Sequence, residues 1–188
     1  PQKYVVTSED GKWKKEYEVT ALFSGIPTSY HFENALPVKD KKGNILYYNF
    51  QESDAIGNIL NWANANEGFN YTTSPAPDGV QGNCVKLTTK DTGSLGALLK
   101  MYIAAGNLFM GSFTLDIGNV LRATKFGVPF THIPTSFKGY YKYKAGEVFT
   151  VKGEPVSGRK DICDIYAVFY ETDDKVKSLD GTNVFTSP

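Results

Sequence analysis

The stretch that decides the fold class is Gly127-Val-Pro-Phe-Thr-His-Ile-Pro-Thr-Ser-Phe-Lys-Gly-Tyr-Tyr-Lys-Tyr143. Glycine and proline recur in it at a spacing that a helix does not tolerate and that is typical of turns. Its last part, residues 137–143, is rich in aromatic residues, which favour β-strands. Tyrosine also combines a flat apolar ring with a polar tip, the surface chemistry needed to hold a sugar ring. The stretch therefore predicts a β-structure suited to sugar binding.

Strand-like runs continue on both sides of this stretch, and turn residues separate them at the intervals of a β-sandwich. The predicted strands are 83–89, 97–103, 107–117, 137–143, 148–152 and 162–171. Along 162–171 we expect the odd positions to face the interior and the even positions to be exposed. The odd positions are Cys163, Ile165, Ala167 and Phe169, and the even ones are Asp164, Tyr166, Val168 and Tyr170. The pattern predicts an all-β fold.

Composition limits the classes of function. The chain has 188 residues, enough for one main domain, and 41% of them are hydrophobic, enough for a packed core. Twenty basic residues balance 20 acidic ones, so no overall field favours nucleic acid or an anionic membrane. No apolar run is long enough to span a bilayer. We expect neither a nucleic-acid partner nor a transmembrane segment.

The first 24 residues are predicted to be a separate β-hairpin. On both sides of Glu9-Asp10-Gly11-Lys12 the side chains alternate between the two faces of a strand. Asp-Gly is a strong hairpin signal. The hairpin resembles the last two strands of an immunoglobulin-like domain. Either it packs on the main domain, or the rest of its own domain is absent from this chain. A short linker follows, and the main domain is expected to cover residues 28–188.

Three segments together carry a resemblance to a known family. They are the stretch quoted above, Gly106-Asn-Leu-Phe-Met-Gly-Ser-Phe113, and Asp161-Ile-Cys-Asp-Ile-Tyr-Ala-Val-Phe-Tyr170. From about His31 to the C-terminus the chain resembles the Bacteroidetes putative carbohydrate metabolism domain. The resemblance implies a jelly-roll sandwich similar to galactose-binding-like carbohydrate modules. It also implies a place at the outer-membrane surface, outside the cell or in the periplasm, with a lipid anchor in the full-length protein.

The resembled family has several further strands after the position of Pro188. An open jelly roll would expose strand edges, which proteins avoid. We therefore expect that this chain is a fragment, or that another polypeptide supplies the missing strands.

Two groups of residues are candidates for carbohydrate binding. Exposed aromatic rings can stack on sugars, and carboxylates or amides can hydrogen-bond hydroxyl groups. Exposed tyrosines can also simply stabilise cross-strand pairs, and a tryptophan can plug the sandwich edge beside an Asn-rich turn. The first group is Tyr140, Asp164, Tyr166 and Tyr170, and the second is Trp62, Asn64 and Asn66, followed by Glu67.

Catalysis is the main alternative to simple binding. A glycoside hydrolase needs two carboxylates at a set separation, and sequence spacing places no such pair. Non-catalytic glycan binding, as part of polysaccharide utilisation, is therefore the predicted function. A glycoside hydrolase and an adhesion or scaffold module that binds protein are the alternatives. The carboxylate candidates for hydrolysis are Glu33, Glu67, Asp164 and Glu171.

The sequence predicts no cofactor and no catalytic metal. Its two histidines are far apart and lack zinc-type spacing. A structural Ca²⁺ is an option that the resemblance implies, although the spacing differs from that of a dedicated calcium loop. Cys84 and Cys163 are either two buried thiols or a disulfide. The oxygen-rich stretch that offers calcium ligands contains Asp173, Asp174, Asp180 and Asn183.

Overall fold

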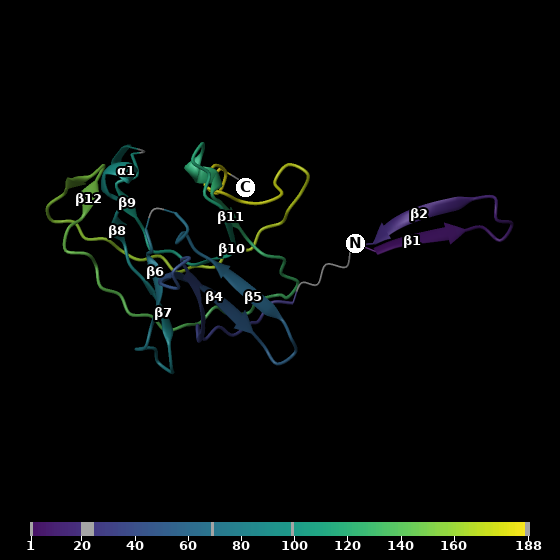
Figure 1. Cartoon of the computed structure of the whole chain (residues 1–188), viewed down its shortest axis with the longest axis horizontal. Coiled ribbons are helices and arrows are strands. Elements are labelled where there is room, and N and C mark those ends of the chain that lie inside the picture. The colour runs from purple at the N-terminus through teal and green to yellow at the C-terminus, as the bar shows by residue number, and fades with distance from the viewer. Residues whose placement is uncertain (1, 20–24, 69, 99, 187–188) are drawn as a thin grey trace.

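A computed structural model of the chain describes residues 2–19, 25–68, 70–98 and 100–186 (Figure 1). The strands before the helix are β1 (Gln2–Thr7), β2 (Lys14–Val19), β3 (Asn34–Lys39), β4 (Ile45–Ser53), β5 (Ile59–Ala63), β6 (Thr73–Ala76), β7 (Cys84–Leu87) and β8 (Lys90–Asp91). The later ones are β9 (Ile103–Ala104), β10 (Phe109–Phe113), β11 (Thr124–Phe126), β12 (Thr150–Val151) and β13 (Glu154–Pro155). Helix is confined in these ranges to α1 (Gly93–Leu98) and the 3₁₀ turn η1 (Val120–Arg122). The all-β fold class is confirmed. In the described ranges, neither helix has the length and apolarity that crossing a membrane requires.

A five-stranded antiparallel sheet, in the order β11-β10-β5-β4-β3, forms the centre of the main body. Two turns with the same sequence pattern, Asp-x-x-Gly-Asn, connect its first three strands at residues 40–44 and 54–58. In each turn the aspartate accepts hydrogen bonds from the backbone and side-chain N–H groups of the asparagine four residues later. Gly43 and Gly57 have φ of 87° and 89°, a conformation that favours glycine. The short turn pattern thus sets the order β3-β4-β5.

The two faces of this sheet differ in chemistry. Phe50 on β4 lies opposite Trp62 on β5, and Leu60 shares their face. Phe50 and Leu60 are 1% and 2% exposed, so this face belongs to the core. The other face carries polar side chains at the intervening positions, among them Gln51 and Asn61, which lie opposite each other. Strand alternation therefore produces one apolar face and one amide-rich face.

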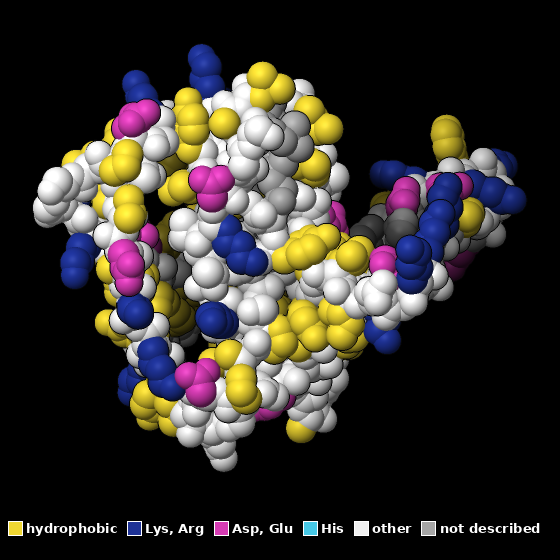
Figure 2. Space-filling model, turned by 60° about the vertical axis from the view of Figure 1, so that its left-hand side comes forward, with side chains coloured by type: hydrophobic (Ala, Val, Ile, Leu, Met, Phe, Trp, Pro, Cys, Tyr) yellow, Lys and Arg dark blue, Asp and Glu magenta, His cyan; other side chains and the backbone are white. Residues whose placement is uncertain are grey.

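The N-terminal hairpin is confirmed. β1 and β2 pair along their whole lengths, with Tyr4 opposite Tyr17, and Gly11 in the turn has φ of 70°. All residues of both strands are exposed, so neither face of the hairpin packs on the rest of the described chain. Figure 2 shows its surface crowded with lysine and acidic side chains.

Three of the predicted strands are wrong. Residues 97–103 overlap the end of α1, and residues 137–143 and 162–171 contain no strand. Both of the latter are extended segments that have no hydrogen-bonded partner strand among the described residues. β-propensity reflects how a side chain fits a paired sheet, so aromatic content alone does not produce a strand.

The predicted sidedness of 162–171 is wrong for the same reason. Ile165 and Phe169, expected in the interior, are 56% and 57% exposed, and Tyr166 is also exposed. Cys163 is exposed as a free thiol, and Cys84 is a half-buried free thiol, so the structure contains no disulfide between them. Without a paired strand, alternation has no inner and outer face to define.

Two neighbouring residues of β5 test the assignment of the core face. Leu60 is 2% exposed and Ile59 is 55% exposed. We expect Leu60→Ala to lower the free energy of unfolding by about 2 to 5 kcal/mol, because it leaves a cavity. Ile59→Ala, the matched control, is expected to cost less than about 1 kcal/mol. Urea unfolding followed by circular dichroism measures both, and equal losses would contradict the assignment.

Candidate functional site

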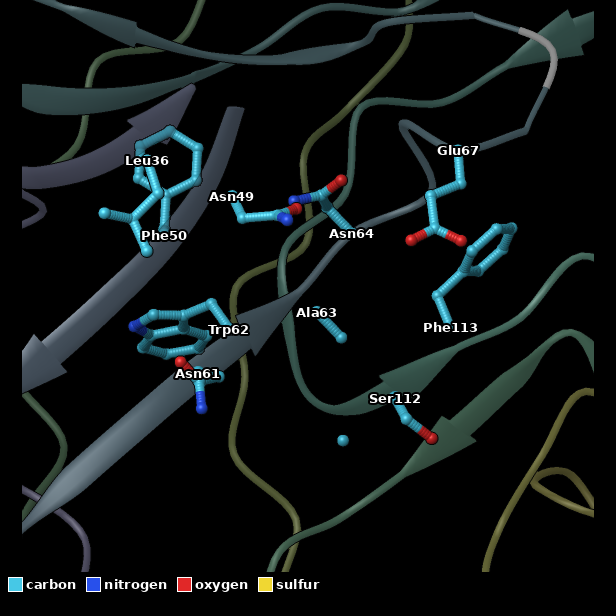
Figure 3. Close-up of a pocket in the computed structure, with 11 residues that line it drawn as sticks. Leu36, Asn49, Phe50, Asn61, Trp62, Ala63, Asn64, Glu67, Ser112 and Phe113 are labelled. Atoms are coloured by element: carbon cyan, nitrogen blue, oxygen red, sulfur yellow. The ribbon is translucent and has the colours of Figure 1, made fainter. Parts of the chain in front are cut away.

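A cleft of about 280 Å³ opens on the amide-rich side of the five-stranded sheet (Figure 3). Strands β3, β4, β5 and β10 and the loop after β5 contribute its lining. The residues that line it are Leu36, Asn49, Phe50, Asn61, Trp62, Ala63, Asn64, Glu67, Gly111, Ser112 and Phe113.

A row of amides crosses this face from strand to strand. Asn34 Nδ2 on β3 donates to Gln51 Oε1 on β4 at 3.3 Å, and Gln51 Nε2 donates to Asn61 Oδ1 on β5 at 2.8 Å. The row fixes the direction in which each amide points, leaving the Nδ2 of Asn61 as a donor directed outward from the row. Asn49, exposed beside it on β4, offers a further donor and acceptor. The cleft floor thus presents oriented amides at the spacing of adjacent strands.

The loop after β5 is held by the buried amide of Asn66, which is 0% exposed. Its Nδ2 donates to the carbonyl oxygens of Tyr48 at 3.2 Å and Thr73 at 2.8 Å. Its Oδ1 accepts from the N–H groups of Thr72 at 2.9 Å and Thr73 at 3.0 Å. All the hydrogen-bonding capacity of the side chain is used within the protein. Asn66 therefore shapes the loop and presents no group to a ligand.

Two other asparagines complete the support of this loop. Asn64 is 5% exposed, and its Oδ1 accepts from the Asn66 N–H at 3.0 Å. Asn107, just before β10, accepts from the Ala65 N–H at 2.9 Å, and its own carbonyl oxygen accepts from Thr73 Oγ1 at 2.7 Å. These bonds tie the loop to β6 and β10, so the next side chain, that of Glu67, is held at the edge of the cleft.

Glu67 and Phe113 point toward one another at one end of the cleft (Figure 3). Glu67 is exposed and Phe113 is half-buried. Among the described residues that line the cleft, Glu67 is the single carboxylate, and none is a lysine, arginine or histidine. The cleft therefore combines one anionic acceptor, one aromatic ring and several amides. Tyr47 lies outside the cleft lining, on the same face of β4 as Asn49; burial raises the pKa of Tyr47, and the charge of Glu67 raises that pKa further.

Trp62 lines the cleft and also packs against aromatic residues of the segment before β3. Its ring packs edge-on against Tyr30, with centroids 5.1 Å apart, and against Phe32 at 5.7 Å. The buried carboxylate of Glu52 fixes that segment by accepting from the N–H groups of His31 and Phe32. In Figure 3 the Trp62 ring is directed away from Glu67. Trp62 is on β5, the central strand of the sheet, and its role as a stacking platform stays a prediction.

The structure brings none of the C-terminal candidates into the cleft. Tyr140 and Tyr166 are 87% and 74% exposed on the extended segments, and Asp164 is exposed between them. Tyr170 is half-buried, and its hydroxyl donates to the Phe126 carbonyl oxygen of β11. This first group of candidates therefore lies outside the cleft lining, whereas Trp62 and Asn64 of the second group line it.

The carboxylates proposed for hydrolysis lie apart from one another. Glu33 accepts from the Asn83 backbone N–H at 2.8 Å and from its Nδ2 at 2.7 Å, which ties the β6-β7 turn to the start of β3. Asp164 and Glu171 are exposed on the segment after β13. Of the four candidates, Glu67 alone belongs to the cleft lining.

The acidic residues of the C-terminal stretch make hydrogen bonds and an ion pair within the protein. One Asp180 oxygen accepts from Thr182, and the other contacts the Lys125 ammonium at 2.6 Å. The hydrogen bond from Lys125 holds the pKa of Asp180 well below its usual range. Asp173 is used instead to accept two backbone N–H groups of its own turn. A lysine thus provides the positive charge at Asp180, and the structural Ca²⁺ stays a prediction.

Sequence reasoning missed most of the cleft floor. The run Ile45–Ser53 reads ILYYNFQES, and its alternate positions place Tyr47, Asn49 and Gln51 on one face. This signal was available in the sequence. Asn61, which lies opposite Gln51, is on β5 and Phe113 is on β10, and their register follows from the folded sheet. A polar residue on one strand becomes a site only through such neighbours.

The chain is an all-β domain with a cleft on one face of its central sheet. The chain belongs to the family described as putative carbohydrate metabolism domain, whose model matches residues 31–188. The match begins after the N-terminal hairpin.

Two solved Bacteroides structures are similar to the chain. A putative glycoside hydrolase from Bacteroides thetaiotaomicron VPI-5482 is 48% identical, with a TM-score of 0.77 over 100% of this chain. A putative glycoside hydrolase from Bacteroides vulgatus ATCC 8482 is 44% identical, with a TM-score of 0.69 over 84% of this chain. The chain spans 57% and 66% of these two proteins, respectively. No curated protein matches the chain significantly.

The role of Asn66 can be measured directly. We expect Asn66→Ala to lower the free energy of unfolding by at least about 2 kcal/mol, because it leaves buried backbone groups without partners. The exposed Asn49→Ala is the matched control and is expected to change it by less than about 0.5 kcal/mol. Urea unfolding at neutral pH gives both values. A loss in the Asn66 variant no larger than in the control would show that the loop does not depend on this amide.

Proposed function

We propose that this domain binds a glycan, without catalysis, in the cleft on the amide-rich face of the five-stranded sheet. The family is related to carbohydrate metabolism. The proposal adds that the sugar lies over β4, β5 and β10, and that the protein acts at the cell surface or in the periplasm during polysaccharide utilisation. A lipid anchor in the full-length protein is part of the same proposal.

The observation that carries the proposal is the opposition of Glu67 and Phe113 above a floor of amides. A sugar has C–H faces that pack on an aromatic ring and hydroxyl groups that donate to carboxylates. Asn49 and Asn61 add donors and acceptors at the floor. Because these groups are placed by strands and by the loop held at Asn66, the site is formed before the ligand arrives, which lowers the cost of binding.

Hydrolysis is the second candidate, because both similar structures are described as putative glycoside hydrolases. Both hydrolytic mechanisms use two carboxyl groups, about 5 to 9.5 Å apart. The described cleft residues offer Glu67 as their one carboxyl group, an arrangement that favours binding. Hydrolysis by this chain would be detected as new reducing ends after incubation with the bound glycan.

A glycan-array screen followed by calorimetry tests the site. We expect the chain to bind at least one glycan, and Glu67→Gln to weaken that binding about tenfold or more, because a neutral amide replaces the charged acceptor. Phe113→Ala is expected to weaken it similarly by removing the ring.

Two controls separate this cleft from other surfaces. Glu33→Gln changes a carboxylate that is tied to Asn83 outside the cleft, and Tyr166→Ala removes an exposed ring on the segment after β13. Both are expected to bind as the unchanged chain does. Loss of binding in Tyr166→Ala with full binding in Glu67→Gln would move the site to the C-terminal segment and overturn the assignment.

A further inference from the structure

A pair of tyrosines lies beyond the Glu67 end of the cleft. The rings of Tyr47 on β4 and Tyr71 in the loop before β6 are 5.5 Å apart, with their planes inclined by 32°. Tyr71 is 45% exposed, and Tyr47 is half-buried. This geometry, close to offset stacking, leaves aromatic surface in contact with solvent. Neither ring belongs to the lining of the cleft described above.

The tyrosine pair and the cleft share one face of the sheet. Tyr47 and Asn49 are two residues apart on β4, so their side chains project from the same face. The rise between them is about 6.6 Å, about the length of one sugar ring. Asn49 lines the cleft together with Glu67, and Asn49 is the neighbour of Tyr47 on this face of β4. The tyrosine pair thus continues the cleft along β4.

The loop held by Asn66 positions both ends of this surface. Glu67 follows Asn66 directly, and Tyr71 precedes Thr72, whose N–H donates to the Asn66 side chain at 2.9 Å. The same set of hydrogen bonds therefore fixes Tyr71 relative to Glu67. A separately mobile tyrosine would not form a fixed platform for a second ring, whereas this one is attached to a clamped loop.

We propose that Tyr47 and Tyr71 form a second stacking subsite, and that the site takes a neutral oligosaccharide of at least two rings. This rests on the proposed glycan-binding function. One ring lies over the neighbouring side chains of Glu67 and Phe113, and the next lies on the tyrosine pair. The ligand is neutral because the one charge among the described cleft residues is the carboxylate of Glu67, and none of those residues offers a cation to a uronic acid.

The test compares ligand length. Calorimetry is run with gluco-, xylo-, manno- and galacto-oligosaccharides of one to six residues, and with galacturonic acid oligomers as the anionic set. For the neutral series that binds, we expect Tyr71→Ala to weaken oligomers of two or more residues about five- to tenfold while leaving the monosaccharide unchanged. Glu67→Gln is expected to weaken every length. Tyr71→Phe keeps the aromatic ring and is expected to bind with the same affinity as the unchanged chain.

The outcomes separate this subsite from a structural role and from the proposed function. If Tyr71→Ala weakens all lengths equally, or none, or if the anionic oligomers bind best, the second subsite is wrong even though the domain binds glycans. If no oligosaccharide binds the unchanged chain, the proposed function itself fails and the subsite with it. A urea unfolding curve of Tyr71→Ala shows whether the loop is retained, and Tyr71→Leu repeats the test if it is not.

Discussion

One buried amide, that of Asn66, sets the geometry on which the rest of the site depends. It makes four hydrogen bonds to backbone groups of three residues from two separate parts of the chain. A buried backbone group without a partner is costly, so each bond also excludes other loop conformations. These bonds hold the described residues next to Glu67, which lines the cleft, and next to Tyr71, whose ring lies beside that of Tyr47.

The second constraint is strand alternation, which gives the central sheet one buried apolar face and one amide-rich face. Phe50 and Leu60 bury one face, and the side chains between them on the same strands are free to be polar. Hydrogen bonds from Asn34 to Gln51 and from Gln51 to Asn61 orient these amides, which limits the entropy that a ligand must remove on binding. Gly111 on β10 has φ of +145°, and a side chain there would overlap the Lys125 carbonyl oxygen. A glycine is thus required where β11 approaches the cleft wall.

The sequence predicted those parts of the fold whose partners are close along the chain. The β1-β2 hairpin follows from Asp10-Gly11 and local alternation, and the all-β class follows from composition and turn spacing. Residues 162–171 have the right composition for a strand, yet a strand forms only beside another strand. The sequence predicted a second group of candidates, Trp62, Asn64, Asn66 and Glu67. Composition does not reveal which of the amides in that group are saturated by backbone groups. Burial and register decide that, and both depend on residues far away in the sequence.

Whether the cleft binds a glycan or hydrolyses it depends on the chemistry of Glu67, the one carboxylate among the described cleft residues. Glu67 is exposed and is the one carboxylate among the described lining residues, and the other polar side chains of that lining are amides and the hydroxyl of Ser112. An exposed carboxylate can accept hydrogen bonds from the hydroxyl groups of a sugar. Glycoside hydrolysis generally uses two carboxyl groups on either side of the scissile bond. A hydrolytic mechanism of that kind would need its second carboxyl group from outside this cleft lining.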